Sequence, residues 1–209
     1  MSSRHPLDED LLEALCADTA LENRTRVWQP LSLAVVLGRA NVAEAEVDVD
    51  ACRVDQVPVQ RRLGGGGAVV LGPGCVVVSQ ARRVHRPTAV RDHMAFGVGC
   101  IAEALGALGG PDLTVRGLGD LCVGDRKVLG SSGFRRRDVF FYQASLLVDI
   151  DMAVVERYLR HPSSEPEYRR GRSHRAFLTT LRGEGMPHTP AGVAGHLARA
   201  LICGEPAAP

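Results

Sequence analysis

Hydrophobic residues recur along the chain with two periods, and each period predicts one kind of element. A spacing of three and four residues places side chains on one face of a helix and predicts helices over 8–20 and 88–108. The pattern is more regular in the helix predicted over 88–108, where one face carries Val90, Met94, Val98, Ile101 and Leu105. Shorter segments predict further helices over 41–54, 151–159, 173–181 and 189–202. Residues 41–54 could equally be extended, since their valines favour strands.

Short apolar runs between glycines, prolines and aspartates predict a sheet. In the first half of the chain they cover 31–38, 58–62, 68–71 and 75–80. In the second half they cover 113–116, 120–123, 126–129, 139–142 and 145–148, with turns at Gly117, at Gly124 and near Gly133. Strands joined by such short turns run antiparallel, and helices do not alternate with them. We therefore predict an α+β fold in which a mostly antiparallel sheet packs against helices.

The composition is that of an ordinary globular protein and argues against several function classes. The 209 residues, 45% hydrophobic and 23% charged, suit one domain. A net charge of +1 and an aromatic content of 4% argue against a nucleic-acid partner. No signal peptide or membrane-spanning apolar run is recognisable, and the six cysteines are too widely spaced for a zinc or redox motif. We expect a cytoplasmic protein with no membrane partner.

Lysine is used once in the whole chain. Of the 25 residues counted as Lys and Arg, 24 are arginines and Lys127 is the single lysine. An ammonium on a flexible stem can reach between a phosphate and a carbonyl oxygen, whereas Arg carries a wide planar head that never loses its charge. Lys127 is therefore a candidate functional residue. The alternative is a surface lysine that persists by accident.

Residues 64–67 are four consecutive glycines between two predicted strands. Each glycine costs conformational entropy on folding, so the run needs an explanation. One interpretation is a loop whose backbone N–H groups approach an anionic or extended ligand, with Arg61 or Arg62 beside it. The other is a mobile loop or bulge. The run is not a nucleotide-binding P-loop, because no GK[ST] sequence follows it.

Four stretches, in this order, resemble one known family. They are RRLGGGGAV (61–69), GDLCVGDRKVLGSS (119–132), SLLVDID (145–151) and GRSHRAFLTTL (171–181). They resemble the lipoate–protein ligase A and lipoyltransferase superfamily, which is related to biotin ligase. The resemblance runs from about residue 31 to 181. It implies a single catalytic domain over 1–203 with the biotin/lipoate protein ligase catalytic fold. The terminal sequence GEPAAP, residues 204–209, is by itself expected to be a disordered tail.

The resemblance also implies an acyl-adenylate site. Lys127 matches the family lysine that reaches the acyl carbonyl and phosphate oxygens. The implied acyl and adenylate pocket is lined by Arg62, Gly64, Gly65, Gly66, Gly67, Ala68, Asp120, Gly130 and Ser131. The implied cofactors are ATP and Mg²⁺, with lipoate or octanoate as the substrate. Asp120 is the candidate Mg²⁺ ligand, with a ribose contact or a plain turn as alternatives. The implied partner is a lipoyl-domain acceptor or a glycine cleavage H-like protein.

The sequence departs from the family pattern at several points. Gly64 stands where many members have Ser, Cys75 where they have Asn, and Gln143 where many ligases have a pocket His. Full-length ligases carry a C-terminal accessory domain for which 209 residues leave no room. We therefore expect either a separate accessory polypeptide, or transfer without adenylation, or altered acyl-adenylate chemistry.

Two further functions stay open at this point. An octanoyltransferase that uses octanoyl-acyl carrier protein needs a reactive cysteine beside the lysine. One family branch has it where this chain has Val115, another in the loop that matches 161–172, which has no cysteine. Cys122 and Cys75 are the nearest candidates. The third possibility is a non-catalytic module that binds lipoate or an acyl-adenylate.

Overall fold

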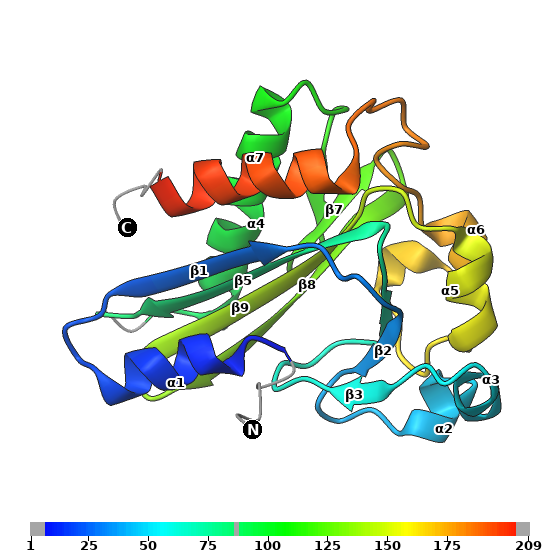
Figure 1. Cartoon of the computed structure of the whole chain (residues 1–209), viewed down its shortest axis with the longest axis horizontal. Helices are drawn as coiled ribbons and strands as arrows, with labels where there is room; N and C mark the ends of the chain where they lie inside the picture. The colour runs from blue at the N-terminus through cyan, green and yellow to red at the C-terminus, as the bar shows by residue number, and fades with distance from the viewer. Residues whose placement is uncertain (1–6, 86–87, 204–209) are drawn as a thin grey trace.

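Two sheets meet at the centre of the molecule (Figure 1). The computed structural model describes residues 7–85 and 88–203. The larger sheet has six strands, all paired antiparallel, in the order β1-β5-β9-β8-β7-β6. The smaller sheet has the order β3-β2-β4, with β2 parallel to β3 and antiparallel to β4. Seven α-helices surround the two sheets within the described ranges.

The strands and helices have the following bounds. The larger sheet consists of β1 (Asn23–Trp28), β5 (Cys75–Arg83), β6 (Thr114–Arg116), β7 (Asp120–Val123), β8 (Arg126–Arg136) and β9 (Val139–Leu147). The smaller sheet consists of β2 (Ala34–Leu37), β3 (Val59–Arg61) and β4 (Val69–Leu71). The helices are α1 (Glu9–Ala17), α2 (Ala43–Glu46), α3 (Val49–Val54), α4 (Val90–Ala107), α5 (Met152–Tyr158), α6 (His174–Phe177) and α7 (Pro190–Cys203).

The two faces of the larger sheet are covered differently. Helices α4 and α7 pack on one face over a fully apolar core that includes Val78, Ile101 and Leu146. Helix α1 covers part of the other face, where its leucines pack on Ala81 and Phe141. The rest of that face is turned toward the smaller sheet. The alternation of side chains along β5 and β9 makes both faces apolar, which is why helices can pack on each.

The predicted fold class is confirmed, but several elements differ from the prediction. Strand β1 was not predicted, because an edge strand that reads NRTRVW has no continuous apolar run. The predicted helix over 41–54 is two short helices, since Asp48 starts a new one by accepting a hydrogen bond from Ala51 N at 2.9 Å. The predicted helix over 173–181 is only α6, because the chain then extends and Leu178 bridges to Lys127 on β8.

The predicted turn near Gly133 is wrong. Strand β8 runs through Gly133, and the chain reverses at Arg137, which has a φ of 55°, and Asp138. A Cβ on Gly133 would lie 2.5 Å from the ring of Phe140 and 2.8 Å from Met94 Sδ. The glycine is therefore needed for close packing beneath α4. The predicted tail over 204–209 lies outside the described residues, and none of the described helices is long and apolar enough to cross a membrane.

Candidate functional site

A cavity of about 760 Å³ lies between the two sheets and brings most of the predicted site residues together. The predicted residues that line it are Arg62, Gly65, Gly66, Gly67, Ala68, Asp120, Lys127, Gly130 and Ser131. A second described cavity, of about 440 Å³ beneath α4, is lined by none of them. Segments that are distant in sequence therefore converge on the larger cavity, which is the candidate site.

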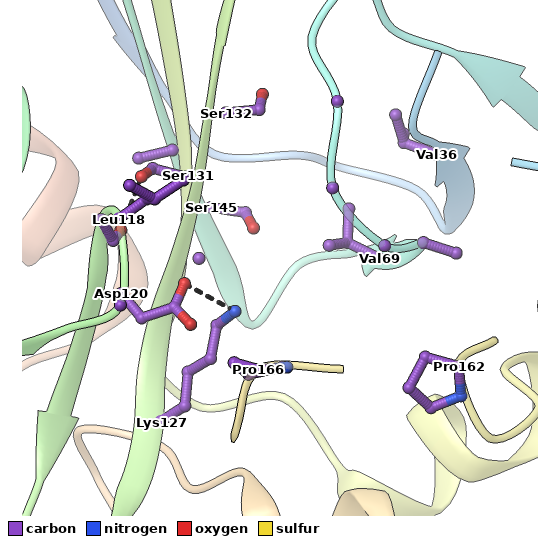
Figure 2. Close-up of a pocket in the computed structure, with 18 of the residues that line it drawn as sticks. Val36, Val69, Leu118, Asp120, Lys127, Ser131, Ser132, Ser145, Pro162 and Pro166 are labelled. Atoms are coloured by element: carbon purple, nitrogen blue, oxygen red, sulfur yellow. Dashed lines mark hydrogen bonds and ion pairs between the residues drawn. The ribbon is translucent and has the colours of Figure 1, made fainter. Parts of the chain in front are cut away.

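One row of residues across the larger sheet forms the floor of this cavity. Gly130 on β8 lies opposite Ser145 on β9, and Ser145 lies opposite Val77 on β5. Directly paired residues point to the same face of a sheet, and all three line the cavity. Figure 2 shows the side chain of Lys127 on one side of the cavity and that of Val36, from β2, on the other. The cavity is thus polar at the β8 end and apolar toward the smaller sheet.

Lys127 and Asp120 form an ion pair in the wall of the cavity (Figure 2). Lys127 Nζ lies 2.8 Å from Asp120 Oδ1, and the two side chains are 22% and 15% exposed. The hydroxyl of Tyr168 donates to the other carboxylate oxygen at 2.7 Å. Burial and the charge of Asp120 raise the pKa of Tyr168, so the hydroxyl keeps its proton. The ammonium is therefore held in position while its head stays accessible from the cavity.

Gly130 and Ser131 shape the strand beneath the lysine. A Cβ on Gly130 would lie 2.8 Å from Lys127 Nζ, so the lysine can lie across β8 only because that residue is glycine. Ser131 Oγ donates to the carbonyl oxygen of Gly119 at 2.5 Å. This bond ties β8 to the residue before Asp120, and it fixes the carboxylate relative to the ammonium.

Arg62 organises the glycine loop. Its guanidinium donates to the carbonyl oxygens of Gly65 at 2.7 Å and Gly67 at 2.8 Å, and more weakly to Val36 O at 3.3 Å. Burial lowers the pKa of Arg62 to about 10, and its Nε has no hydrogen-bond partner among the described residues. A buried guanidinium surrounded by carbonyl oxygens gains further stabilisation from a nearby anion. The loop therefore suits a negatively charged ligand.

The glycines of the loop have different roles. A Cβ on Gly65 or Gly67 would meet no atom within 4 Å, so a ligand in the cavity can approach the backbone there. Gly66 has a φ of 91°, a conformation that other residues rarely adopt. Gly64 does not line the cavity. A Cβ there would lie 2.8 Å from Ser132 Cβ on β8. Gly64 allows the loop to pack closely on β8.

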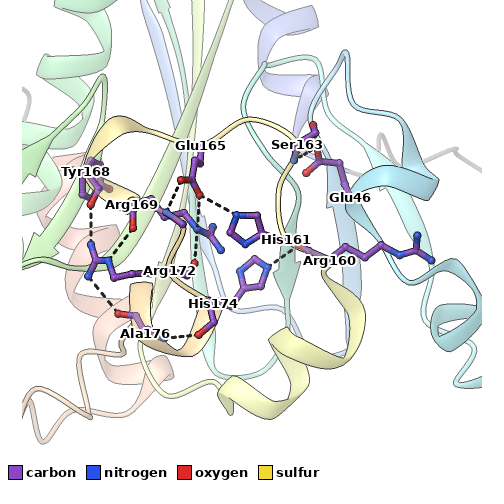
Figure 3. A network of polar contacts seen from close by, with 12 residues as sticks. Glu46, Arg160, His161, Ser163, Glu165, Tyr168, Arg169, Arg172, His174 and Ala176 are labelled. Atoms are coloured by element: carbon purple, nitrogen blue, oxygen red, sulfur yellow. Dashed lines mark hydrogen bonds and ion pairs between the residues drawn. The ribbon is translucent and has the colours of Figure 1, made fainter.

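The loop of residues 161–172 lines one side of the cavity. Figure 3 shows the polar contacts that hold this loop. Glu165 Oε2 lies 3.3 Å from Arg169 Nε inside the loop, and Arg172 pairs with Asp125 of the β7–β8 hairpin at 2.9 Å. Together with the bond from Tyr168 to Asp120, these contacts attach the loop to β7 and β8. The loop residues that line the cavity are Pro162, Ser164, Glu165, Pro166, Glu167 and Arg169.

The cysteines closest to the predicted site have the properties of buried thiols. Burial raises the pKa of Cys75 to about 11, and Cys75 is fully buried. Burial also raises the pKa of Cys122, whose Sγ donates to the Tyr168 hydroxyl at 3.7 Å. A nucleophilic cysteine needs a lowered pKa and access to its substrate. Neither residue lines the cavity, so neither has the geometry of a thioester-forming nucleophile.

The residues around Asp120 do not form a ready metal site. Both carboxylate oxygens already accept contacts, from Lys127 and Tyr168. In residues 7–85 and 88–203 there is no group of three or more His, Cys, Asp or Glu side chains that could hold a metal ion. The role of Asp120 as a Mg²⁺ ligand stays a prediction, and no chemical step below depends on it.

Three residues that shape the site were not predicted as site residues: Leu7 and Gln143, which line the cavity, and Tyr168, which holds Asp120 from behind it. Tyr168 is the single Phe, Tyr or Trp in the 161–172 loop, which is the only hint the sequence offers of its role. Leu7 lines the cavity from two residues before α1, and nothing in the periodicity marks it. Gln143, noted only as a departure from the family His, donates through its amide to Leu7 O at 2.6 Å. All three act through tertiary contacts.

The arrangement of sheets and cavity is an α+β fold shared with solved lipoate–protein ligases. A chain from the structural analysis of an archaeal lipoylation system, a bipartite lipoate protein ligase and its E2 lipoyl domain from Thermoplasma acidophilum, superposes with a TM-score of 0.75 at 21% identity. The match covers 92% of this chain and 76% of that one. A lipoate-protein ligase A bound with ATP gives a TM-score of 0.72 at 21% identity, over 90% of this chain and 76% of that chain. At these identities the likeness establishes the fold.

Residues 6–202 match the family model of the lipoyl protein ligase A/B catalytic domain, and the chain belongs to that family. A curated relative, lipoate-protein ligase A subunit 1 of Thermoplasma acidophilum, is 26% identical over 142 residues, which is 63% of this chain. The match spans about half of that relative, 53% of its length. The resemblance inferred from the four sequence stretches is therefore confirmed.

Proposed function

We propose that this chain is the catalytic part of a lipoate–protein ligase, which activates lipoate or octanoate with ATP and transfers the acyl group to a lysine of a lipoyl domain. The observation that carries the proposal is the Lys127 ammonium, held by Asp120 over Gly130 at the end of a mostly apolar cavity. A cation at one end of an apolar cavity suits an acid with a hydrocarbon tail, since the carboxylate can pair with the cation while the tail lies among apolar side chains.

The residues support both steps of such a reaction. In the first step a carboxylate oxygen of the acid attacks the α-phosphorus of ATP, and pyrophosphate leaves. Lys127, Arg62 and the amides at Gly65 and Gly67 are donors that can stabilise the negative oxygens of both reactants. In the second step the uncharged amine of the acceptor lysine attacks the acyl carbonyl, AMP leaves, and the attacking nitrogen loses a proton. Lys127 can then stabilise the developing oxyanion.

The loop of residues 161–172 contributes shielding from water. It lies against the cavity and is attached to Asp120 through Tyr168. An acyl phosphate anhydride hydrolyses readily, and a covered site protects it while the acceptor docks. The same cover lowers the local dielectric constant and strengthens the contacts of Lys127.

We further propose a separate accessory polypeptide that completes the adenylation step. The chain spans about half of a relative that is itself named as one subunit of a ligase. The archaeal ligase with the same fold is bipartite and has an E2 lipoyl domain as its partner. A lipoyl domain or a glycine cleavage H-like protein is the acceptor we propose, with ATP and Mg²⁺ as cofactors and a cytoplasmic location.

Mass spectrometry of a lipoyl-domain acceptor distinguishes the candidate functions. The chain is incubated with the acceptor and, in separate mixtures, with ATP, Mg²⁺ and lipoate, with preformed lipoyl-AMP, or with octanoyl-acyl carrier protein. Acylation from ATP and lipoate identifies a complete ligase. Acylation from lipoyl-AMP alone identifies a transfer subunit that needs the accessory polypeptide. Acylation only from the carrier protein overturns the proposal in favour of an octanoyltransferase, and no acylation in any mixture favours a binding module.

The variant Lys127→Arg tests the assigned residue. We expect acylation to fall at least about 100-fold, a loss typical of removing a key donor to an oxyanion, with unchanged thermal unfolding. Arg126→Lys, which changes the neighbouring half-exposed residue paired with Glu184, is the matched control and should keep its activity. Full activity of Lys127→Arg would exclude the proposed role.

A further inference from the structure

The smaller cavity, of about 440 Å³, lies on the opposite face of the larger sheet from the candidate site. The candidate site takes Val77 from β5 and Gln143 from β9, whereas the smaller cavity takes Gln80 and Tyr142 from the same strands. Residues an odd number of positions apart on a strand point to opposite faces. Among the described residues none lines both cavities, so the sheet separates them. The volume suits a small organic molecule.

Polar residues line this cavity where the pattern of the strand leads one to expect core. Val78 is fully buried beneath α4 and α7, but the next two positions on that face of β5 are Gln80 and Arg82. The register places Thr25 and Asn23, from β1, opposite them. Directly paired residues share a face, and all four polar residues line the cavity. The valines of β5 thus give way to polar residues where the cavity begins.

Arg82 carries a positive charge that its surroundings do not neutralise. Its Nη2 donates to His93 Nδ1 at 3.1 Å, and its guanidinium carbon lies 3.9 Å from the centre of the Phe96 ring. Its Nη1 is buried and has no hydrogen-bond partner within residues 7–85 and 88–203. Burial lowers the pKa of Arg82, and no carboxylate of the described residues raises it again. A desolvated cation without a counter-charge is costly, and an anion beside it reduces that cost.

The other charged groups at the cavity are already paired. Glu22 is the single acidic side chain among the described lining residues, and it lies 2.6 Å from His85 in an exposed pair. Arg83 also lines the cavity, but its guanidinium is paired with Asp138. One unneutralised positive charge therefore faces a ligand. It matches a single negative charge, and the carboxylate of Glu22 disfavours an ion that carries two.

The rest of the lining favours a ligand with an apolar body. Apolar side chains from α4, β9 and α7 contribute to it: Phe96, Phe140 and Leu201. A further donor is at hand in Gln80, whose Nε2 makes only a long contact of 3.5 Å, with Thr25 Oγ1. A carboxylate can thus meet the guanidinium and this amide while the body that carries it is buried among apolar side chains.

We propose that the smaller cavity is a second binding site, which takes a small organic monoanion: a carboxylate carried on an apolar body. Arg82 provides the counter-charge and Gln80 a further hydrogen-bond donor. The site lies across the sheet from Lys127 and does not depend on the function proposed for that lysine.

A titration followed by ¹H–¹⁵N NMR tests the site with three probes. Benzoate has the proposed charge and apolar body, benzamide has the same shape without the charge, and inorganic phosphate has charge without the body. We expect benzoate to shift the amide signals of Gln80, Arg82 and Phe96 to saturation, with an affinity at least about tenfold higher than that of benzamide. Phosphate should leave these signals in place.

The variant Arg82→Met assigns the binding to one side chain. It keeps an unbranched stem beside Phe96 and removes the charge, so benzoate affinity should fall at least about tenfold. The melting temperature should stay equal or rise, because an uncompensated buried cation is lost. Arg24→Met is the matched control, since Arg24 is exposed, lies one position from Asn23 and so points to the other face of β1. It should keep the wild-type affinity.

Gln80→Leu provides a second variant, which retains the cation and should bind benzoate about threefold more weakly because one donor is lost. It decides the question if Arg82→Met does not fold, and an unchanged affinity would then contradict the site. The proposal is also overturned by equal affinities for benzoate and benzamide, by a stronger response to phosphate, by unchanged binding in Arg82→Met, or by benzoate shifts confined to the signals around Lys127.

Discussion

At the scale of single residues, the position of Lys127 explains why one lysine stands among 24 arginines. Its ammonium lies over Gly130 and contacts one oxygen of Asp120, in a space that a compact charge on an unbranched stem can occupy. A planar guanidinium in the same place would need room on both sides of the contact. The lysine and the glycine three residues later are therefore parts of one arrangement.

Gly130→Ala should displace the lysine without unfolding the protein. The added Cβ would lie 2.8 Å from Lys127 Nζ, the movable end of a flexible side chain, so the ammonium should shift away from Asp120. We expect acylation of the lipoyl domain to fall at least about tenfold, since misplaced catalytic groups lose much of their effect.

Gly99→Ala on α4 provides the comparison for that experiment. A Cβ there meets nothing within 4 Å, and alanine favours a helix over glycine. Its activity should be unchanged and its melting temperature equal or higher. A Gly130→Ala protein with the full acylation rate would contradict the described placement of the lysine.

Residue-level prediction from the sequence succeeded where short motifs carry the chemistry. Lys127, Arg62 and Gly65 all line the cavity, and each belongs to a local pattern that the family resemblance makes visible. Leu7 and Tyr168 could not be found in this way. Each reaches the site through contacts with residues far away in the sequence, and no local pattern records such contacts.

At the scale of elements, one hydroxyl links the loop of residues 161–172 directly to the carboxylate of Asp120. Tyr168→Phe removes the hydrogen bond to Asp120 and leaves the ring in contact with Phe177. A hydrogen bond to a charged group contributes about 1.5 kcal/mol to the free energy that holds a segment in its folded position. We expect amide hydrogen exchange within the loop to become roughly tenfold faster, measured by mass spectrometry of its peptides.

Tyr158→Phe is the matched control for the loop experiment. It also removes a tyrosine–aspartate hydrogen bond, to Asp55 at 2.8 Å, but on the α3–α5 side of the molecule. Exchange in the 161–172 loop should keep its wild-type rate in this variant. Equal exchange in wild type and Tyr168→Phe would mean that other contacts, such as that between Arg172 and Asp125, hold the loop alone.

Element boundaries were predictable where residues of one kind fill one face. Helix α4 and strand β7 follow from such patterns, whereas β8 continues past the predicted end at 129 to Arg136, and β9 joins the two runs predicted over 139–142 and 145–148. The turn near Gly133 was misplaced because a glycine that makes room for Phe140 looks the same in sequence as a glycine that turns the chain. Strand β1 was missed because its pairing with β5 is invisible before the sheet is known.

At the scale of the whole molecule, stability should fall on mild acidification. His93 accepts a hydrogen bond from Arg82 at its Nδ1, at 3.1 Å, which requires the neutral ring. Burial, and then the charge of Arg82, lower the pKa of His93 below its ordinary 6.5. A lowered pKa in the folded state stabilises the protein above pH 6.5, and this contribution is lost as the pH falls through the folded pKa.

Thermal unfolding between pH 7.5 and about pH 5 measures this loss. His93→Asn should show a smaller drop in melting temperature over that range than the wild type, each protein being compared with its own value at neutral pH. Part of the drop should remain, because burial also lowers the pKa of His174. An identical pH dependence in the variant would show that His93 is not coupled to folding.

The hydrogen bond from Gln143 to the carbonyl oxygen of Leu7 joins residues that are 136 positions apart in the sequence. Because a chain is synthesised from its N-terminus, Leu7 leaves the ribosome long before β9 exists. This side of the cavity can therefore close only after most of the chain has been made, and its completion is a late step of folding.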